Sequence, residues 1–315
     1  MSEFGAQSTT DEVLAAHGLT GQTVFITGGA PGLGQETARA MAAKGAHVVI
    51  AARDAGKLEA AAAAIREDTG SKLVETIMLD LASQDAVRAC ANEANERFDK
   101  IDLLINNAGV MACPQSETAD GFEMQFGTNH LGHFSLTKHI LPLVRKGTGK
   151  RIINLSSRAH HNDGVHLDDV GFENRTYEKW VSYGQSKTAN VLFSVALNKR
   201  LDDIDVFAVH PGGINTNLGR HLTPDDVKAL IARIEESEGG GFTFKSIEQG
   251  AATSCWAATA PEIAGQGGVY CEDCHIAEVD DESSASGVRS YALDPEIAEG
   301  LWSLSERMVG ESFTV

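Results

Sequence analysis

The chain has 315 residues, of which 44 are acidic and 26 basic, giving a net charge of −18. This length suffices for one large α/β domain or two small ones. The strong negative charge repels nucleic acid and anionic membrane surfaces, so we expect neither as a partner. The opening "MSEFGAQSTTDEVLAAHGL" lacks the basic start and apolar core of a secretory signal, and no apolar run is long enough to span a bilayer. Five scattered cysteines indicate a reduced, cytoplasmic protein without a disulfide scaffold.

Short β-branched runs alternate with helical segments along most of the chain. A capping-box pattern at Thr9 and Glu12 predicts a short helix, so we treat 1–20 as an N-terminal helical extension of one catalytic domain over 21–315. Helices are predicted at 34–45, 55–70 and 294–310, and further ones between the later strands. Strands are predicted at 23–29, 46–54, 73–81, 101–109, 150–157, 205–213 and 267–273. This alternation predicts an α/β fold with a single Rossmann-type, doubly wound parallel sheet of about seven strands and helices on both faces.

Two segments do not fit the alternation and are expected to shape a substrate pocket. The first runs from about 158 to 181. The second runs from about 218 to 244 and contains a helix flanked by loops, with three consecutive glycines at 239–241. Loops of this length usually carry function or are disordered.

A glycine-rich turn follows the first predicted strand. "TGGAPGLG" contains Thr27, Gly28, Gly32 and Gly34. Glycines here allow the backbone to approach a pyrophosphate, while the start of the next helix offers free N–H groups and a positive dipole end. In an open parallel sheet, ligands bind beyond the carboxyl ends of the strands. The turn therefore predicts a nucleotide site.

Tyr183 and Lys187 lie one helical turn apart in "VSYGQSK" and must be neighbours on a helix. A free tyrosine has a pKa near ~10, too high for a base near neutral pH. An ammonium group within roughly 6 Å favours the phenolate and is expected to lower that pKa. The pair is then suited to giving and taking a proton. Taken alone, this spacing is common in half-exposed helices.

Further motifs follow the glycine turn along the chain in this order: "NNAG" at Asn106 to Gly109, "INLSS", "YGQSK" and "HPGGINT". Together they resemble the short-chain dehydrogenase/reductase family. "NHLGHF" and the long segment before Tyr183 are similar to the retinol-dehydrogenase-like branch. The resemblance implies an NAD(P)(H)-dependent oxidoreductase that transfers hydride between the nicotinamide and an alcohol/carbonyl pair, and a homodimer or homotetramer.

The resemblance also implies residue roles. Tyr183 would exchange the proton, Lys187 would activate it, Ser157 rather than Ser156 would hold the carbonyl oxygen, and Asn129 would be the fourth catalytic member. The implied cofactor-binding residues are Thr27, Gly28, Gly32, Leu33, Gly34, Arg53, Asp80, Leu81, Asn107, Ala108, Gly109, Tyr183, Lys187, Pro211, Gly212 and Thr216.

Cofactor choice is predicted from the end of the second strand. NAD enzymes carry an acid there for the ribose 2′-OH, whereas an arginine suits a 2′-phosphate. Ala52 occupies the acid's place, Arg53 follows, and Asp54 comes one residue too late. We therefore favour NADP(H), with NAD(H) as the alternative. Pro31 stands where NADP-using relatives often carry a second basic residue.

The substrate is expected to be apolar, bound by residues from the two irregular segments. The candidate contacts are Met111, Arg158, Leu218 and Phe242, with Trp180 as a further apolar wall. Two other functions stay open: an NAD-linked catabolic alcohol dehydrogenase, and a nucleotide-binding sensor or scaffold without turnover.

Other cysteine and histidine residues do not form a recognisable metal motif. Cys271, Cys274 and His275 match the spacing of a c-type haem attachment site, but haem attachment needs export and a zinc site needs a second ligand pair. We interpret them as strand-end and loop residues and expect no metal. His160 and His161 are expected near the mouth of the pocket.

Overall fold

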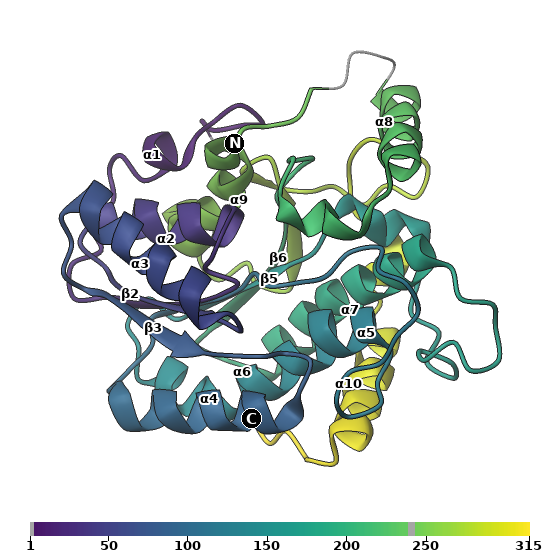
Figure 1. The fold of residues 1–315 in the computed structure, drawn as a ribbon, viewed down its shortest axis with the longest axis horizontal. Helices are drawn as coiled ribbons and strands as arrows, with labels where there is room; N and C mark the ends of the chain where they lie inside the picture. The colour runs from purple at the N-terminus through teal and green to yellow at the C-terminus, as the bar shows by residue number, and fades with distance from the viewer. Residues whose placement is uncertain (1–2, 239–242) are drawn as a thin grey trace.

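Eight strands form one sheet in the order β3-β2-β1-β4-β5-β6-β7-β8 (Figure 1). The computed structural model describes residues 3–238 and 243–315. The strands are β1 (Thr23–Thr27), β2 (His47–Ala52), β3 (Val74–Met78), β4 (Leu103–Asn106), β5 (Arg151–Leu155), β6 (Asp205–His210), β7 (Val269–Glu272) and β8 (His275–Ile276). All pairs from β3 to β7 are parallel. The predicted α/β fold with a doubly wound sheet is confirmed.

The strand count differs from the prediction by one short strand. β8 has two residues and pairs antiparallel with β7. Asp273 and Cys274, with φ of 47° and 57°, turn the chain back on itself between them. A pair of residues is too short for side-chain alternation to reveal it in the sequence.

Helices cover both faces of the sheet (Figure 1). The helices α1, α2, α3 and α9 lie over one face, and α4, α6, α7 and α10 over the other. Their bounds, with those of the short α5 and of α8, are α1 (Thr10–Val13), α2 (Leu33–Ala43), α3 (Ala55–Thr69), α4 (Gln84–Arg97), α5 (Met124–Phe126), α6 (Gly132–Arg145), α7 (Lys179–Arg200), α8 (Pro224–Glu238), α9 (Ile247–Thr259) and α10 (Pro295–Val309). Among the described residues, none of the helices combines the length and apolarity needed to cross a bilayer.

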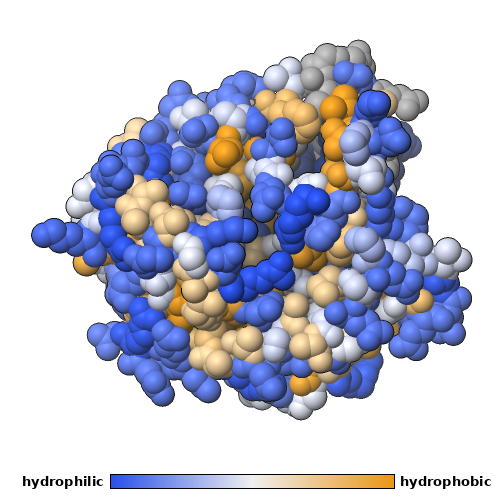
Figure 2. All heavy atoms as spheres, viewed as in Figure 1, coloured by the Kyte–Doolittle hydropathy of each residue, from blue (hydrophilic) through white to orange (hydrophobic). Residues whose placement is uncertain are grey.

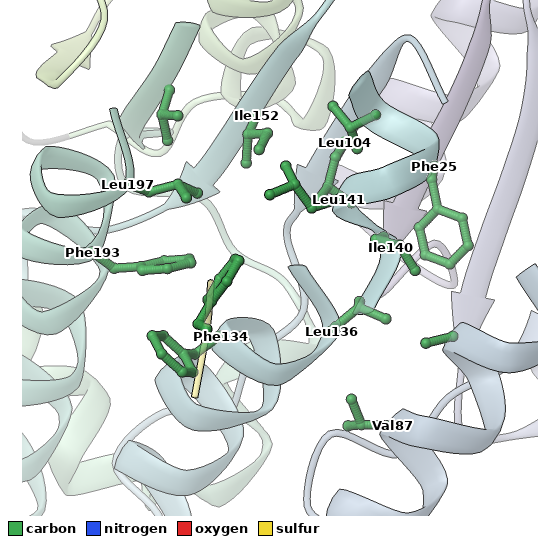
Figure 3. Close-up of a cluster of buried hydrophobic side chains, with 14 of the residues drawn as sticks. Phe25, Val87, Leu104, Phe134, Leu136, Ile140, Leu141, Ile152, Phe193 and Leu197 are labelled. Atoms are coloured by element: carbon green, nitrogen blue, oxygen red, sulfur yellow. The ribbon is translucent and has the colours of Figure 1, made fainter. Parts of the chain in front are cut away.

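The core beneath the sheet is built from strand and helix side chains that interdigitate (Figure 3). Phe25 and Leu104 come from β1 and β4, Phe134 comes from α6, and Phe193 extends from α7 into the cluster. All four are completely or almost completely buried. Their β-branched and aromatic neighbours on the strands are buried on both faces, which is typical of a central parallel sheet. This core fixes the carboxyl ends of the strands that carry the site.

Both ends of the chain are anchored to the sheet's helices. Thr9 and Glu12 form the predicted capping box at the start of α1. The Thr10 hydroxyl donates to Glu36 on α2, and Arg39 bonds both Glu36 and Asp11. At the other end α10 packs against α7 (Figure 1).

Both irregular segments contain short helices and loops outside the sheet. The first begins with a 3-10 helix, Arg158–Asn162, that packs against α7. The second contains a 3-10 helix, Asn217–His221, and then α8, which stands away from the sheet (Figure 1). The helix predicted in this segment is therefore present. The three glycines and Phe242 fall outside the described residues.

Candidate active site

A cavity of about 900 Å³ opens beyond the carboxyl ends of the strands. Its lining residues follow β1 to β6, and the second irregular segment closes one side. The strand order reverses between β1 and β4, which is where a doubly wound sheet binds its ligand. The volume is that of a small-molecule site. Among the residues predicted to form the site, the lining includes Gly28, Leu33, Gly34, Arg53, Asp80, Leu81, Asn107, Ala108, Gly109, Met111, Ser157, Arg158, Tyr183, Lys187, Pro211, Gly212, Thr216 and Leu218.

The glycine turn has no room for side chains where it packs against its neighbours. Gly28 has a φ of 68°, and a Cβ there would lie 2.8 Å from the Cα of Ala108. A Cβ on Gly34 would lie 2.3 Å from the carbonyl oxygen of Gly28. At Gly32, by contrast, the nearest atom would be 3.8 Å away, on Thr216. The turn thus presents open backbone at the start of α2, where no side chain caps the helix. These features fit a dinucleotide phosphate.

The turn is held to the end of β4 by a set of short hydrogen bonds. Asn107 Nδ2 donates to the carbonyl oxygens of Thr27 and Gly28 at 2.8 and 3.1 Å. Thr27 Oγ1 accepts the backbone N–H groups of Asn107 and Ala108 at 2.9 and 3.0 Å. Thr27 is itself fully buried and does not line the cavity. Its role is to fix the two strand ends relative to each other.

Tyr183, Lys187 and Ser157 meet at the floor of the cavity. Both Tyr183 and Lys187 are 4% exposed, and Lys187 Nζ lies 5.6 Å from the centroid of the Tyr183 ring. Lys187 Nζ also donates to the carbonyl oxygen of Leu155 at 3.1 Å. The Ser157 side chain hydrogen-bonds Tyr183. Ser156 also lines the cavity, and its hydroxyl donates to the backbone carbonyl of Lys187 at 2.8 Å.

The pKa of Tyr183 moves in the opposite direction to the prediction. Burial raises the pKa of Tyr183 to about 12, and the hydrogen bond from Ser157 only partly offsets this. Burial also lowers the pKa of Lys187 to about 8. Desolvation destabilises the charged form of each group. In the protein without cofactor or substrate, this destabilisation is larger than the attraction between the Lys187 ammonium and a Tyr183 phenolate. The expectation that Lys187 lowers the pKa of Tyr183 below its ordinary value is therefore wrong for this state.

Asn129 lies behind the cavity wall and not on it. It sits in a π-helical turn, Gly127–Leu131, and is fully buried. Its Oδ1 accepts the N–H of Val110 at 2.8 Å, while Nδ2 donates to the carbonyl of Val110 and to Ser186 Oγ, both at 2.9 Å. Asn129 thus ties the loop after β4 to α7, the helix of Tyr183 and Lys187.

His133 connects Asn129 to the end of β1, a contact that the sequence did not predict. Its Nδ1 lies 2.9 Å from the carbonyl oxygen of Asn129, which can only accept, so Nδ1 carries the hydrogen. Its Nε2 then accepts the hydroxyl of Thr27 at 2.8 Å. Burial lowers the pKa of His133 to about 4, which keeps this tautomer neutral. The motif "NHLGHF" carries both residues, but only the structure shows the connection.

Arg53 and Asp54 follow β2, and both line the cavity. Asp54 is the N-cap residue of α3, and its side chain accepts the N–H of Lys57 at 3.0 Å. Arg53 is exposed on the cavity lining. Asp80 also lines the cavity and accepts the N–H of Ala82 at 3.0 Å.

One side of the cavity is apolar. Figure 2 shows hydrophobic surface beside α8 and strongly hydrophilic side chains around the centre of the hollow. Besides Met111, Trp180 and Leu218, the apolar lining comprises Leu222, Val227, Leu230, Ile231 and Phe244, which were not predicted. The helical spacing of Val227, Leu230 and Ile231 was the available signal. His161, expected near the mouth, lines the cavity, whereas His160 is fully buried.

Cys271, Cys274 and His275 lie in the hairpin between β7 and β8. Both cysteines are fully buried, whereas His275 is exposed. Their position is the strand-end and loop position that was expected.

The sequence is similar to those of known proteins, and this similarity identifies its family. The sequence profile described as short chain dehydrogenase matches residues 22–227. The chain belongs to the short-chain dehydrogenase family. It is 40% identical over 298 residues to human retinol dehydrogenase 13, covering 93% of this chain and 86% of the relative. With human retinol dehydrogenase 14 the identity is 38% over 307 residues, covering 93% and 87%. These relatives confirm the retinol-dehydrogenase-like branch.

A solved structure of the short-chain dehydrogenase fold also matches. The Pseudomonas aeruginosa RhlG/NADP active-site complex superposes with a TM-score of 0.64 at 28% identity, covering 85% of this chain and 98% of that one. Family membership makes this chain an oxidoreductase that uses a nicotinamide cofactor, as the resemblance of its motifs implied.

Proposed function

We propose that this oxidoreductase uses NADP(H) to interconvert an apolar alcohol and its carbonyl compound, with Tyr183 as the acid and base. The observation that carries the proposal is that Tyr183, Ser157 and Lys187 meet in a cavity whose other end is the glycine turn. Arg53 at the end of β2 and the named NADP complex of a relative support the choice of NADP(H). The apolar side of the cavity and the retinol dehydrogenases among its relatives support a bulky apolar substrate.

In the reductive direction, Ser157 and Tyr183 bind the carbonyl oxygen of the substrate. Bound NADPH would supply the hydride to the carbonyl carbon, from its pro-S face as in the family. Tyr183 donates its proton to the oxygen as negative charge develops there. Because the pKa of Tyr183 is raised to about 12, the phenol is fully protonated at neutral pH and is a competent acid.

Lys187 and Ser157 stabilise the phenolate that Tyr183 leaves behind. The Lys187 ammonium lies beside the Tyr183 ring, and the Ser157 hydroxyl donates a hydrogen bond. A lysine with a pKa of about 8 can also return a proton near neutral pH. Asn129 and His133 do not contact the substrate in this scheme; they hold the backbone after β4 in place.

The test is the Tyr183→Phe variant, assayed with a panel of apolar aldehydes and NADPH. We expect NADPH to bind as tightly as in the wild type and turnover to fall at least about a hundredfold, the scale of a lost general acid. Tyr177→Phe is a matched control, because the Tyr177 hydroxyl bonds the carbonyl of Cys113 and lies outside the cavity lining. Turnover retained by Tyr183→Phe would refute the role of Tyr183.

The compartment belongs to the same proposal. All five cysteines are buried and unpaired. Free thiols are typical of a reducing environment, which supports a cytoplasmic location.

A further inference from the structure

Arg220 is one of four arginines among the described residues that line the cavity, and it lies near another of them, Arg53. It belongs to the 3-10 helix Asn217–His221 in the second irregular segment, far from Arg53 in the sequence. The two guanidinium groups are close enough to repel each other: burial lowers the pKa of Arg220, and the charge of Arg53 lowers it further. The pKa of His221 is lowered by burial and then by both arginines.

The path of the chain after β6 explains how Arg220 reaches this place. Thr216 is the residue nearest to the open side of Gly32, at 3.8 Å from a Cβ built there. Ile214 lies directly against Gly250. A Cβ on Gly250 would lie 2.5 Å from the Ile214 side chain and 2.9 Å from the Leu33 side chain. The segment therefore crosses over the start of α2 and carries Arg220 from the β6 side of the sheet toward β2.

Neither arginine has a carboxylate partner among the described residues. Other arginines, such as Arg39, Arg66 and Arg97, do form ion pairs. Within the described part of the chain, the guanidinium of Arg220 makes one hydrogen bond, at 3.3 Å to the carbonyl of Asn217. In a chain of net charge −18, two unpaired like charges that share a cavity wall form a site for an anion.

We propose that Arg220 and Arg53 together bind the 2′-phosphate of NADP(H). Arg220 supplies the second positive charge that Pro31 does not provide in the glycine turn. The inference rests on the proposed function, since it names the group of the cofactor that these residues contact. Two guanidinium groups suit a phosphate because each offers paired N–H donors in a planar fork.

The site has a consequence for the substrate pocket. Arg220 stands between Leu218 and Leu222, which both line the apolar side of the cavity. A phosphate held by Arg220 therefore fixes the same short segment that contacts the substrate. NADPH should order this segment, whereas NADH should not.

The experiment is calorimetric binding of 2′,5′-ADP and 5′-AMP to the full chain, with no substrate present. The two probes share the adenosine and the 5′-phosphate and differ only in the 2′-phosphate. Wild-type protein should bind 2′,5′-ADP more tightly by at least about tenfold, a difference of about 1.4 kcal/mol. Arg220→Leu should weaken the binding of 2′,5′-ADP by about tenfold and leave the affinity for 5′-AMP within about twofold.

Two further variants distinguish the effect of a positive charge at position 220 from the effect of the protein's overall charge. Arg220→Lys keeps the positive charge and should retain most of the preference for 2′,5′-ADP. Lys228→Leu removes a charge from α8, where the lysine side chain is 80% exposed, and should change neither affinity. Circular dichroism of each variant checks that it is folded.

Each other outcome overturns the inference. If Arg220→Leu weakens the binding of both probes equally, Arg220 contacts the 5′-phosphate and not the 2′-phosphate. If it weakens neither, Arg220 is an ordinary surface charge. Both results leave the proposed function standing, because they do not touch hydride transfer. Wild-type protein that binds neither probe would instead contradict the proposed function itself.

Discussion

Replacing Lys187 by methionine should make the protein more stable while removing its activity. Methionine has a similar length and no charge, so it fills the same space. The carbonyl oxygen of Leu155 loses the Lys187 ammonium but keeps a hydrogen bond from Asn190 Nδ2 at 2.9 Å. The substitution therefore leaves no buried acceptor without a partner.

The magnitude follows from the lowered pKa of Lys187. Burial lowers that pKa from 10.5 to about 8, and each pKa unit is worth about 1.4 kcal/mol, so the buried charge costs about 3 kcal/mol below pH 8. Losing the hydrogen bond to Leu155 costs about 1 kcal/mol. We expect Lys187→Met to be more stable than the wild type by about 2 kcal/mol at pH 7.

The pH dependence of the stability difference between Lys187→Met and the wild type independently tests the sign of this effect. Between pH 8 and 10.5 the unfolded chain holds a proton that the folded chain has released, so the wild type gains stability relative to the variant as pH rises. The advantage of the variant should shrink across this window and reverse by about pH 10.5. Urea unfolding followed by tryptophan fluorescence at pH 7, 8, 9 and 10 measures it.

Lys199→Met is the matched control for this prediction. Lys199 lies on the same helix with a side chain 62% exposed, so its replacement should change stability by less than about 0.5 kcal/mol at every pH. A Lys187→Met variant that is less stable than the wild type at pH 7 would refute the reasoning. Parallel pH profiles for the variant and the wild type would refute it as well.

Three further perturbations test other parts of the structure. Burial alone would raise the pKa of Asp102, but hydrogen bonds from the backbone, from side chains and from Lys100 lower it from 3.8 to about 2. The Asp102→Asn variant should therefore be less stable than the wild type by about 2 kcal/mol at neutral pH. Urea unfolding should show this difference disappear as pH falls from 4 to 2. Gly34→Ala places a Cβ 2.3 Å from a carbonyl oxygen of the glycine turn and should weaken NADPH binding at least about tenfold by fluorescence titration; unchanged affinity would contradict the role of the turn. Burial lowers the pKa of His130 to about 3 and that of His133 to about 4, so both histidines take up a proton when the protein unfolds in mild acid. The free energy of unfolding should therefore fall by about 3 kcal/mol per pH unit between about pH 6 and 4. A stability that does not change with pH in this range would contradict the burial of the two histidines as neutral groups.

The sequence predicts those features that depend on local spacing or on special backbone conformations. Gly28 is predictable because its positive φ and its close approach to Ala108 exclude any side chain. The proximity of Tyr183 and Lys187 follows from helical geometry alone. The order of strands and helices follows from β-branched runs that alternate with helical periodicity.

The features that the sequence did not predict arise from contacts between distant segments. The direction of the pKa shift of Tyr183 depends on burial, which no local pattern reports. His133 bridges Thr27 and Asn129 only because the π-helical turn and the end of β1 meet. Arg220 reaches the cavity because the segment after β6 crosses over α2.

The most direct test of the account follows the hydride itself. Wild-type protein is incubated with NADPH deuterated at the pro-S position and a bulky apolar aldehyde, and the alcohol product is analysed by mass spectrometry. We predict deuterium on the carbinol carbon with the wild type and no product with Tyr183→Phe. An alcohol without deuterium, or turnover unchanged in Tyr183→Phe, would contradict hydride transfer assisted by Tyr183.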